Sequence, residues 1–300
     1  ITKWYGQKYR PHYGTIVDAG RKGLPETQKD LIRLADDRLF PTIVRATALS
    51  LLGSYSGVEV TRAYERALSD EEPIMRHTAI RYLVPLNPQK QIQSAVPLLY
   101  DPIKAVRIEA ARSLAALPPG QLNGEQQKKY QTVLNEYQQA MEYTADFAAS
   151  RHNLGNLYTS LGRLEKAEES YQAAIRIDDE FYPAKVNLAM LYNQMGENNE
   201  AERLLREVVQ AHPQLHEVQY SLGLLLAERK KYEEASLYLS MAARGLPNRA
   251  RVHYNLGLLL DYLRKDLEAE VALLRALEID PDNMDYLYAI AQFYLKRERY

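Results

Sequence analysis

The chain has 300 residues, of which 46% are hydrophobic and 26% charged, values that are ordinary for a soluble folded protein. Its net charge of −1 excludes the strongly basic balance of a nucleic-acid or anionic-membrane binder, so neither partner is expected. The absence of cysteine excludes disulfides, thiolate metal sites and covalent haem attachment, and no apolar run reaches the roughly 20 residues that membrane insertion needs.

Residues 1–23 are rich in aromatic side chains and glycine but show no period. The aromatic side chains of this stretch are Trp4, Tyr5, Tyr9, His12 and Tyr13. We expect the stretch to form an N-terminal cap or lead-in that packs over the first repeat. The chain starts at Ile1 rather than at Met and stops at Tyr300 within a repeat, so we interpret it as a fragment of a longer polypeptide.

Residues 24–117 contain a period of 31 residues. The recurring residues are Arg45, Arg76 and Arg107, then Ala48, Ala79 and Ala110, and finally Leu52, Leu83 and Leu114. Each copy follows an acidic residue and a proline, and the pattern resembles the short helical hairpins called HEAT-like repeats. Three such units are predicted. Their arginines are expected to pair with acidic groups of neighbouring turns, as structural staples rather than as ligand contacts.

Residues 118–147 are predicted to form a linker and a junction helix. The stretch LPPGQLNGE over 117–125 breaks any helix twice. A helix is expected over about 126–144, because Tyr137 and Ala140 stand where the second helix of a preceding repeat would place them. No matching first helix comes before it, so we interpret it as the junction between two repeat types.

From residue 148 to residue 300, a position that is always small returns every 34 residues. It is filled by Gly155, Ala189, Gly223, Gly257 and Ala291. The same spacing separates Ala167, Ala201, Ala235 and Ala269, and also Pro213, Pro247 and Pro281. A fixed period of this length predicts a stack of two-helix units, in which the small residue lets the partner helix approach closely. The predicted units are 148–181, 182–215, 216–249 and 250–283, with a truncated fifth at 284–300.

The stretch NLGNLYTSLGRLEKAEESYQAAIRID (153–178) resembles the tetratricopeptide-repeat family almost position for position. This resemblance covers about half of the chain and implies an all-α fold built as a right-handed α-α superhelix. With the preceding hairpins, the chain would be a double solenoid of HEAT-like and then tetratricopeptide hairpins. The family resemblance also implies a scaffold that binds a peptide or protein segment on its concave face.

In this family the first helix of each repeat lines the concave face, and the repeat phase identifies the side chains that should point there. They form a ladder of tyrosines and asparagines with an apolar strip, and comprise His152, Asn153, Asn156, Asn187, Met190, Tyr220, Leu224, Tyr254, Asn255, Leu258 and Tyr288. An asparagine amide holds an extended peptide backbone through both donor and acceptor, and tyrosine gives a rigid amphipathic contact. The alternative is that the asparagines bond only between adjacent helices. Because these positions are largely neutral, a basic clamp for a C-terminal carboxylate is not expected.

No catalytic motif stands out in the sequence. It contains no glycine-rich phosphate loop, no H-E-x-x-H and no nucleophile elbow. His212 and His216 are four residues apart, but Pro213 and the repeat phase place them across a turn, which argues against a metal site. The chain is therefore not expected to be an enzyme, and no cofactor is expected within it.

The order of the parts is itself distinctive. KYRPHYG (8–14), then PTIVRATALSLL (41–52), then the 34-residue repeats resemble the C-terminal region of bacterial multihaem c-type cytochromes. This resemblance implies an upstream haem domain, a periplasmic location and a redox partner protein; a cytoplasmic location is the alternative. Two alternatives to a plain scaffold follow: the docking region of an electron-transfer cytochrome, or the regulatory region of an enzyme whose catalytic domain lies outside this chain.

Overall fold

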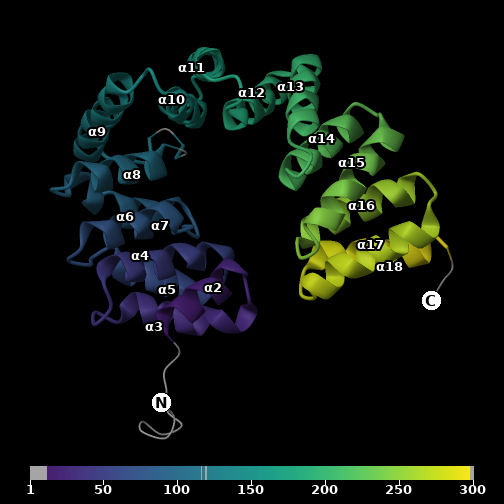
Figure 1. Ribbon diagram of the computed structural model, residues 1–300, viewed down its shortest axis with the longest axis horizontal. Helices are drawn as coiled ribbons and strands as arrows, with labels where there is room; N and C mark the ends of the chain where they lie inside the picture. The colour runs from purple at the N-terminus through teal and green to yellow at the C-terminus, as the bar shows by residue number, and fades with distance from the viewer. Residues whose placement is uncertain (1–11, 116, 119, 298–300) are drawn as a thin grey trace, which may run out of the picture. The chain divides into compact units, whose positions relative to one another are not determined.

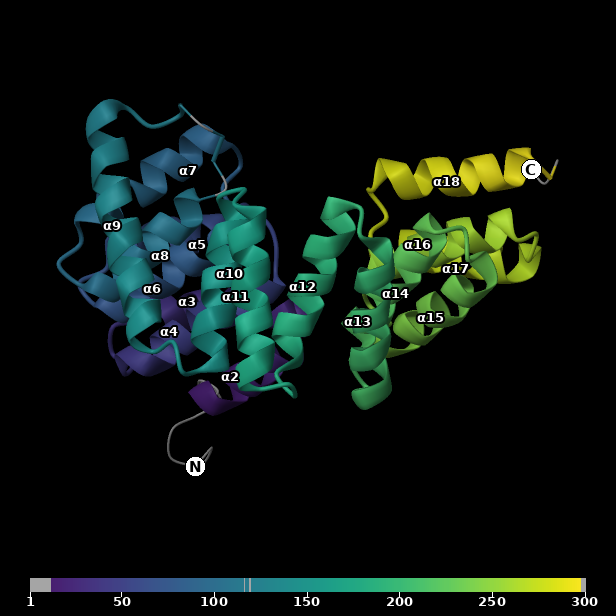
Figure 2. The same cartoon turned by 90° about the horizontal axis from the view of Figure 1, so that it is seen from above.

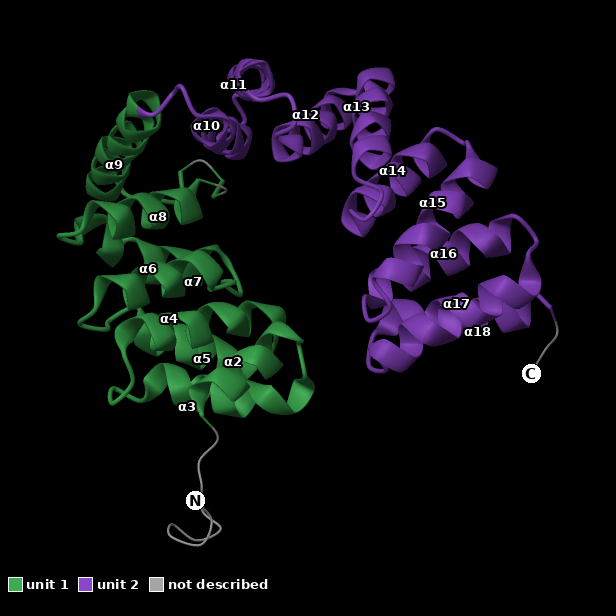
Figure 3. Cartoon of the chain, in the orientation of Figure 1, with its two compact units in different colours: residues 1–143 green, residues 144–300 purple. Residues whose placement is uncertain are grey.

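The computed structural model describes residues 12–115, 117–118 and 120–297, and within these ranges every regular element is a helix. The helices pack as paired hairpins, which confirms the predicted all-α class. The chain divides into two compact units, residues 1–143 and residues 144–300, drawn in green and purple in Figure 3.

The first unit begins with α2 (Tyr13–Arg21), ends with α9 (Gly124–Tyr143), and holds three hairpins between them (Figure 1). The hairpins are α3 (Gln28–Asp36) with α4 (Thr42–Leu51), α5 (Val58–Ala67) with α6 (Pro73–Tyr82), and α7 (Pro88–Ala95) with α8 (Lys104–Leu114). Three short 3-10 helices accompany them, at Pro25–Thr27, Leu52–Ser54 and Pro97–Tyr100. The second helix of each hairpin packs on the next one, α4 on α6 and α6 on α8, and their starts repeat the 31-residue period.

Local contacts account for the packing of α2 at one end of this unit and for the start of α9 at the other. The part of the predicted lead-in that is described, α2, packs on α3 and α4, and Gly20 allows close contact with Leu31 and Leu51. Residues 1–11, with Trp4 among them, lie outside the described residues. At the other end, Asn123 and Gln126 exchange backbone-to-side-chain hydrogen bonds of 2.9 and 3.0 Å, which is a capping box that starts α9.

Buried arginines join the hairpins of the first unit, as the sequence predicts. Arg45 pairs with Asp70 at 2.6 Å, with side chains only 7% and 9% exposed, and its Nε donates to the carbonyl oxygen of Ala35. One repeat later, Arg76 pairs with Asp101 at 2.6 Å. Both carboxylates lie in the following turn, which confirms the expected staples at these two positions.

The third staple, that of Arg107, has a different kind of partner. Its guanidinium pairs at 2.6 Å with Glu136, which lies on α9 rather than in a turn, because α9 takes the place of a further hairpin. Burial acts to raise the pKa of Asp70 and of Asp101, but backbone N–H donors and the paired arginines outweigh it and hold each pKa below its ordinary value.

The second unit is a stack of four hairpins followed by one helix. Its first helices are α10 (Ala148–Ser160), α12 (Tyr182–Met195), α14 (His216–Glu228), α16 (Ala250–Tyr262) and α18 (Met284–Leu295). Its second helices are α11 (Leu164–Ile177), α13 (Asn198–Ala211), α15 (Tyr232–Gly245) and α17 (Asp266–Ile279). Both series start at the predicted spacing, and the recurring prolines follow the ends of α13, α15 and α17. The last helix, α18, packs against α16 and α17 (Figure 2).

The small residue of each repeat marks the place where the two helices of a hairpin touch. A Cβ atom added at Gly155 would lie 2.4 Å from the ring of Tyr171, and one added at Gly223 would lie 2.8 Å from Leu239. Close approach thus depends on the missing side chain, as expected. At the equivalent position of α18, Ala291 is exposed, because within the described residues no second helix covers it.

Candidate functional site

Polar side chains join each first helix of the second unit to the next first helix. Between α10 and α12, the amide nitrogen of Asn187 lies 2.9 Å from Nε2 of His152 and donates to Oδ1 of Asn156 at 2.7 Å. Between α14 and α16, the amide of Asn255 donates to the hydroxyl of Tyr220 at 2.6 Å. These contacts lie at the same place in the repeat, near the middle of the first helix.

The two remaining interfaces are joined near the C-terminal ends of the first helices instead. Asn193 of α12 donates to the carboxylate of Glu228 on α14 at 3.0 Å, and Lys296 pairs with Asp261 of α16 at 3.2 Å. One contact in each of the four interfaces spans 35 residues, one more than the period. The joints therefore alternate along the stack, and each interface has a polar contact that fixes its register.

The predicted asparagine ladder is partly committed to these joints. Asn187 directs its amide nitrogen at both His152 and Asn156, and Oδ1 of Asn156 also accepts a hydrogen bond of 2.8 Å from the hydroxyl of Tyr171. An amide nitrogen has two hydrogens, so Asn187 has no further donor for a ligand. The role considered as the alternative, bonding between helices, is present at these positions.

One of the predicted contact residues, Tyr220, is buried in the stack, and another, His152, is half-buried against aromatic rings. Tyr220 is only 9% exposed, and burial raises the pKa of its hydroxyl while the hydrogen bond from Asn255 opposes the rise. The ring of His152 lies 5.9 Å from that of Tyr171 and 5.5 Å from that of Phe181. The ring of Tyr220 fills space within the stack, which corrects the expectation that Tyr220 is a surface contact.

Other predicted residues do form an exposed surface. Met190, Leu224 and Leu258 stand at the same position of α12, α14 and α16 and are 58%, 38% and 40% exposed. We call these three residues the apolar strip. Tyr288 on α18 is also exposed, whereas Asn153 and Tyr254 are half-buried. Single exposed apolar residues are common on proteins, but the same exposed position in three successive repeats is typical of a contact surface.

The apolar strip ends at a pocket of about 390 Å³ on α16 and the turn after it. The pocket is lined by Leu258, Asp261, Tyr262, Arg264 and Lys296. Four of these residues were not predicted from the sequence, because the prediction followed only the middle of each first helix. Tyr262 lies four residues after Leu258, hence on the same helix face, and that spacing could have revealed it.

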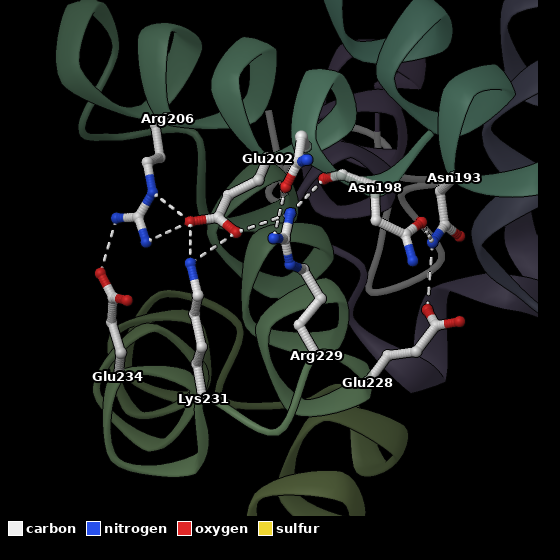
Figure 4. A network of polar contacts seen from close by, with 9 residues as sticks. Asn193, Asn198, Glu202, Arg206, Glu228, Arg229, Lys231 and Glu234 are labelled. Atoms are coloured by element: carbon white, nitrogen blue, oxygen red, sulfur yellow. Dashed lines mark hydrogen bonds and ion pairs between the residues drawn. The ribbon is translucent and has the colours of Figure 1, made fainter. Parts of the chain in front are cut away.

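A second polar cluster joins α13 to the turn between α14 and α15 (Figure 4). The buried carboxylate of Glu202 accepts hydrogen bonds of 2.8 and 2.9 Å from Lys231, pairs with Arg206 at 2.8 Å and lies 3.1 Å from Arg229. Arg206 also pairs with Glu234 at 2.6 Å. Burial acts to raise the pKa of Glu202, but these cations outweigh it and keep the pKa below its ordinary value. Since the cluster is internally paired, we assign it to holding the repeats together.

Neither a metal cluster nor a membrane span is present among the described residues. In the part of the chain that the structure describes, no group of three or more His, Asp or Glu side chains could hold a metal ion. None of the described helices has the length and apolar character of a membrane span. His212 contacts the ring of Tyr182, whereas Nδ1 of His216 lies 3.0 Å from Gln219, so this pair of histidines has separate partners.

Comparison with known proteins identifies the second unit. Tetratricopeptide-repeat family models match residues 148–181, 166–222 and 250–283. A solved structure of MamA, from residue 41 to its end, from Desulfovibrio magneticus RS-1 is 20% identical with a TM-score of 0.48, and the match covers 51% of this chain and 86% of that one. YrrB, a TPR protein with an unusual peptide-binding site, is 23% identical with a TM-score of 0.49, over 54% and 84% of the chains. No curated protein matches the sequence. The three family matches all lie within the second unit and show that this unit contains tetratricopeptide repeats.

Proposed function

We propose that this protein is a protein-interaction scaffold that binds an extended peptide or protein segment across the first helices of its second unit. The apolar strip carries the proposal, because Met190, Leu224 and Leu258 repeat along three neighbouring helices and remain exposed. Covering such side chains gains about 25 cal/mol for each Å² of apolar surface removed from water. A segment that crosses the repeats would contact each of them in turn.

Polar groups beside the strip can orient such a segment. Asn255 donates to Tyr220, and its carbonyl oxygen remains an acceptor for a peptide N–H. Tyr288 is exposed on α18 and offers both a ring and a hydroxyl. Backbone contacts of this kind favour an extended ligand whatever its sequence, whereas the strip requires apolar side chains at intervals.

The test is a selection from a random peptide library on the full chain, followed by binding measurements with an enriched peptide. The test variant carries Met190→Ser, Leu224→Ser and Leu258→Ser. The control variant carries Leu237→Ser, Leu267→Ser and Val271→Ser, three residues of the second helices that are each more than half exposed. Both sets lie on the surface, so each substitution should change stability by no more than about 0.5 kcal/mol.

The proposal requires a loss of at least about tenfold in affinity for the test variant, which corresponds to 1.4 kcal/mol. The control variant should bind as the unchanged chain does. If the second-helix variant loses binding instead, the contact surface lies on the opposite helices. Failure of the unchanged chain to enrich any peptide would contradict peptide binding itself.

A further inference from the structure

The pocket at the end of the apolar strip has an apolar wall held in place by its neighbours. Leu258 and Tyr262 are both exposed and lie one turn apart on α16. The ring of Tyr262 packs against that of Tyr232, with centroids 4.5 Å apart. This wall can accept one large apolar side chain of a ligand beside the charged part of the pocket.

The charged part of the pocket is positive. Its one carboxylate, that of Asp261, pairs with Lys296 at 3.2 Å and with Arg297 at 2.7 Å, and Arg297 also pairs with Asp266. The charges of these two cations and two carboxylates balance. Arg264 also lines the pocket, and among the described residues it has no ion-pair partner. The charge left over for a ligand is therefore that of the Arg264 guanidinium, with Lys296 beside it.

The backbone at Arg264 gives a second, independent observation. Its φ of 61° is left-handed, a conformation that side-chain-bearing residues adopt at a cost in stability. The equivalent turn position holds Gly162 and Gly196 in the first two repeats, with φ of 67° and 84°, and Lys230 in the third, with φ of 62°. Glycine is the residue suited to this turn, so an arginine here costs stability, and no described ion pair offsets that cost. Strain of this kind gathers at ligand contacts.

We propose that this pocket binds an acidic side chain, so that the ligand of the first helices is an acidic peptide. An Asp or Glu carboxylate of the ligand meets Arg264 and Lys296, and a neighbouring apolar side chain covers Leu258 and Tyr262. A guanidinium suits this role because its N–H groups match the two oxygens of a carboxylate. The inference rests on the proposed function and specifies the chemistry of its ligand.

The experiment uses the same library, with the random segment flanked on both sides so that no free C-terminal carboxylate takes part. Enriched peptides should carry Asp or Glu next to a large apolar residue. One such peptide, labelled with a fluorophore, is then titrated by anisotropy with the full chain and with Arg264→Gly, Arg264→Lys and Lys265→Ala. Arg264→Gly removes the charge and also relieves the turn, so loss of folding does not confound it. Lys265→Ala removes the same charge one residue later, outside the lining of the pocket.

Arg264→Gly should weaken binding about tenfold, as expected for the loss of a charged hydrogen-bonding partner. Arg264→Lys should recover part of the affinity, Lys265→Ala should bind as the unchanged chain does, and the affinity should fall as salt is raised. Enrichment of peptides without acids, or equal binding by Arg264→Gly, would overturn the inference while leaving the proposed function intact. If the unchanged chain enriches no peptide, both fail.

Discussion

The two units of this protein stack helical hairpins by different means. In the first unit, buried arginines reach into the next repeat, where Arg45 and Arg76 each bind a carboxylate. Each of them also donates to the backbone of its own hairpin. In the second unit, a missing side chain, as at Gly155 and Gly223, lets two helices touch. Stacking in the first unit therefore depends on charged side chains, whereas stacking in the second depends on close contact at a residue without a side chain. The second unit therefore leaves some side chains of the first helices, among them Met190, Leu224 and Leu258, exposed to a ligand.

The largest loss of stability is expected when one partner of a buried staple is removed. Asp70→Ala leaves the guanidinium of Arg45 buried without its carboxylate, and we expect the free energy of unfolding of the first unit to fall by about 3–5 kcal/mol. Hydrogen exchange of the amides in α4 and α6 measures the loss. The matched control is Asp36→Ala, whose partner Arg66 is half exposed, and it should cost less than about 1 kcal/mol. Equal losses in the two variants would show that the buried Arg45–Asp70 pair contributes no more to stability than the exposed Arg66–Asp36 pair.

The equivalent test in the second unit places a side chain at a glycine where the two helices of a hairpin touch. Gly223→Leu places a side chain against Leu239, and we expect the unit to lose about 1–3 kcal/mol of stability from overpacking. Ala291→Leu introduces the same side chain at the same repeat position, but on an exposed face of α18, and should cost no more than about 0.5 kcal/mol. Thermal unfolding followed by circular dichroism distinguishes the two. A similar loss of stability in both variants would contradict the claim that close helix contact depends on the missing side chain of Gly223.

A smaller effect, of opposite sign, is expected at the turns of the second unit. Arg264→Gly and Lys230→Gly should each raise the free energy of unfolding by about 1 kcal/mol, because both residues have left-handed φ values near 60°. Lys265→Gly is the control, since its φ of −89° suits any residue, and it should destabilise slightly. Denaturant titration measures all three. Destabilisation by Arg264→Gly would show that its side chain contributes more to the fold than its turn costs.

The smallest expected effect is a dependence on pH. Burial lowers the pKa of His77 in the first unit; Arg81 and Arg112 add to this and Glu109 opposes it. As the pH falls below the ordinary value of about 6.5, the unfolded chain takes up a proton that the folded chain does not. Stability is therefore full above this value and declines below it, until the pH reaches the lower pKa of the folded state. His77→Gln should flatten the decline in the first unit.

The second unit provides the matched comparison. Burial also lowers the pKa of His253, against the opposing effect of the Pro247 carbonyl, so His253→Gln should flatten the decline only in that unit. Hydrogen exchange between pH 5 and pH 7, resolved by helix, reports both units in one sample. If either variant leaves the slope of its own unit unchanged, that histidine does not titrate as its burial implies.

The sequence period located the helices of the second unit because small residues and prolines mark the same contacts in every copy. It did not reveal which first-helix residues are exposed. Tyr220 is buried because Asn255, in the next repeat, lies against its hydroxyl, and that partner is 35 residues away rather than 34. Exposure depends on such pairs, and a single period does not show them.

The role of Arg264 was not predicted from the sequence, whereas the arginine staples were. Arg264 was missed although Gly162, Gly196 and Lys230 occupy the same turn, and a cation in place of glycine was the available signal. The staples of Arg45 and Arg76 were predictable because each of these arginines precedes a recurring acidic turn, whereas the partner of Arg107 lies on α9. The resemblances to HEAT-like repeats and to multihaem cytochromes stay predictions, since they depend on generic helical patterns and on the order of the parts.

The most direct test of the binding surface is hydroxyl-radical footprinting of the full chain with and without an enriched peptide. We predict that the peptide lowers the oxidation of Met190, Leu258 and Tyr262, which are exposed without it. Oxidation of Leu237 and Leu267, on the second helices, should not change. Protection of the second-helix residues, with Met190 and Leu258 still oxidised, would contradict the claim that the first helices of the second unit form the binding surface.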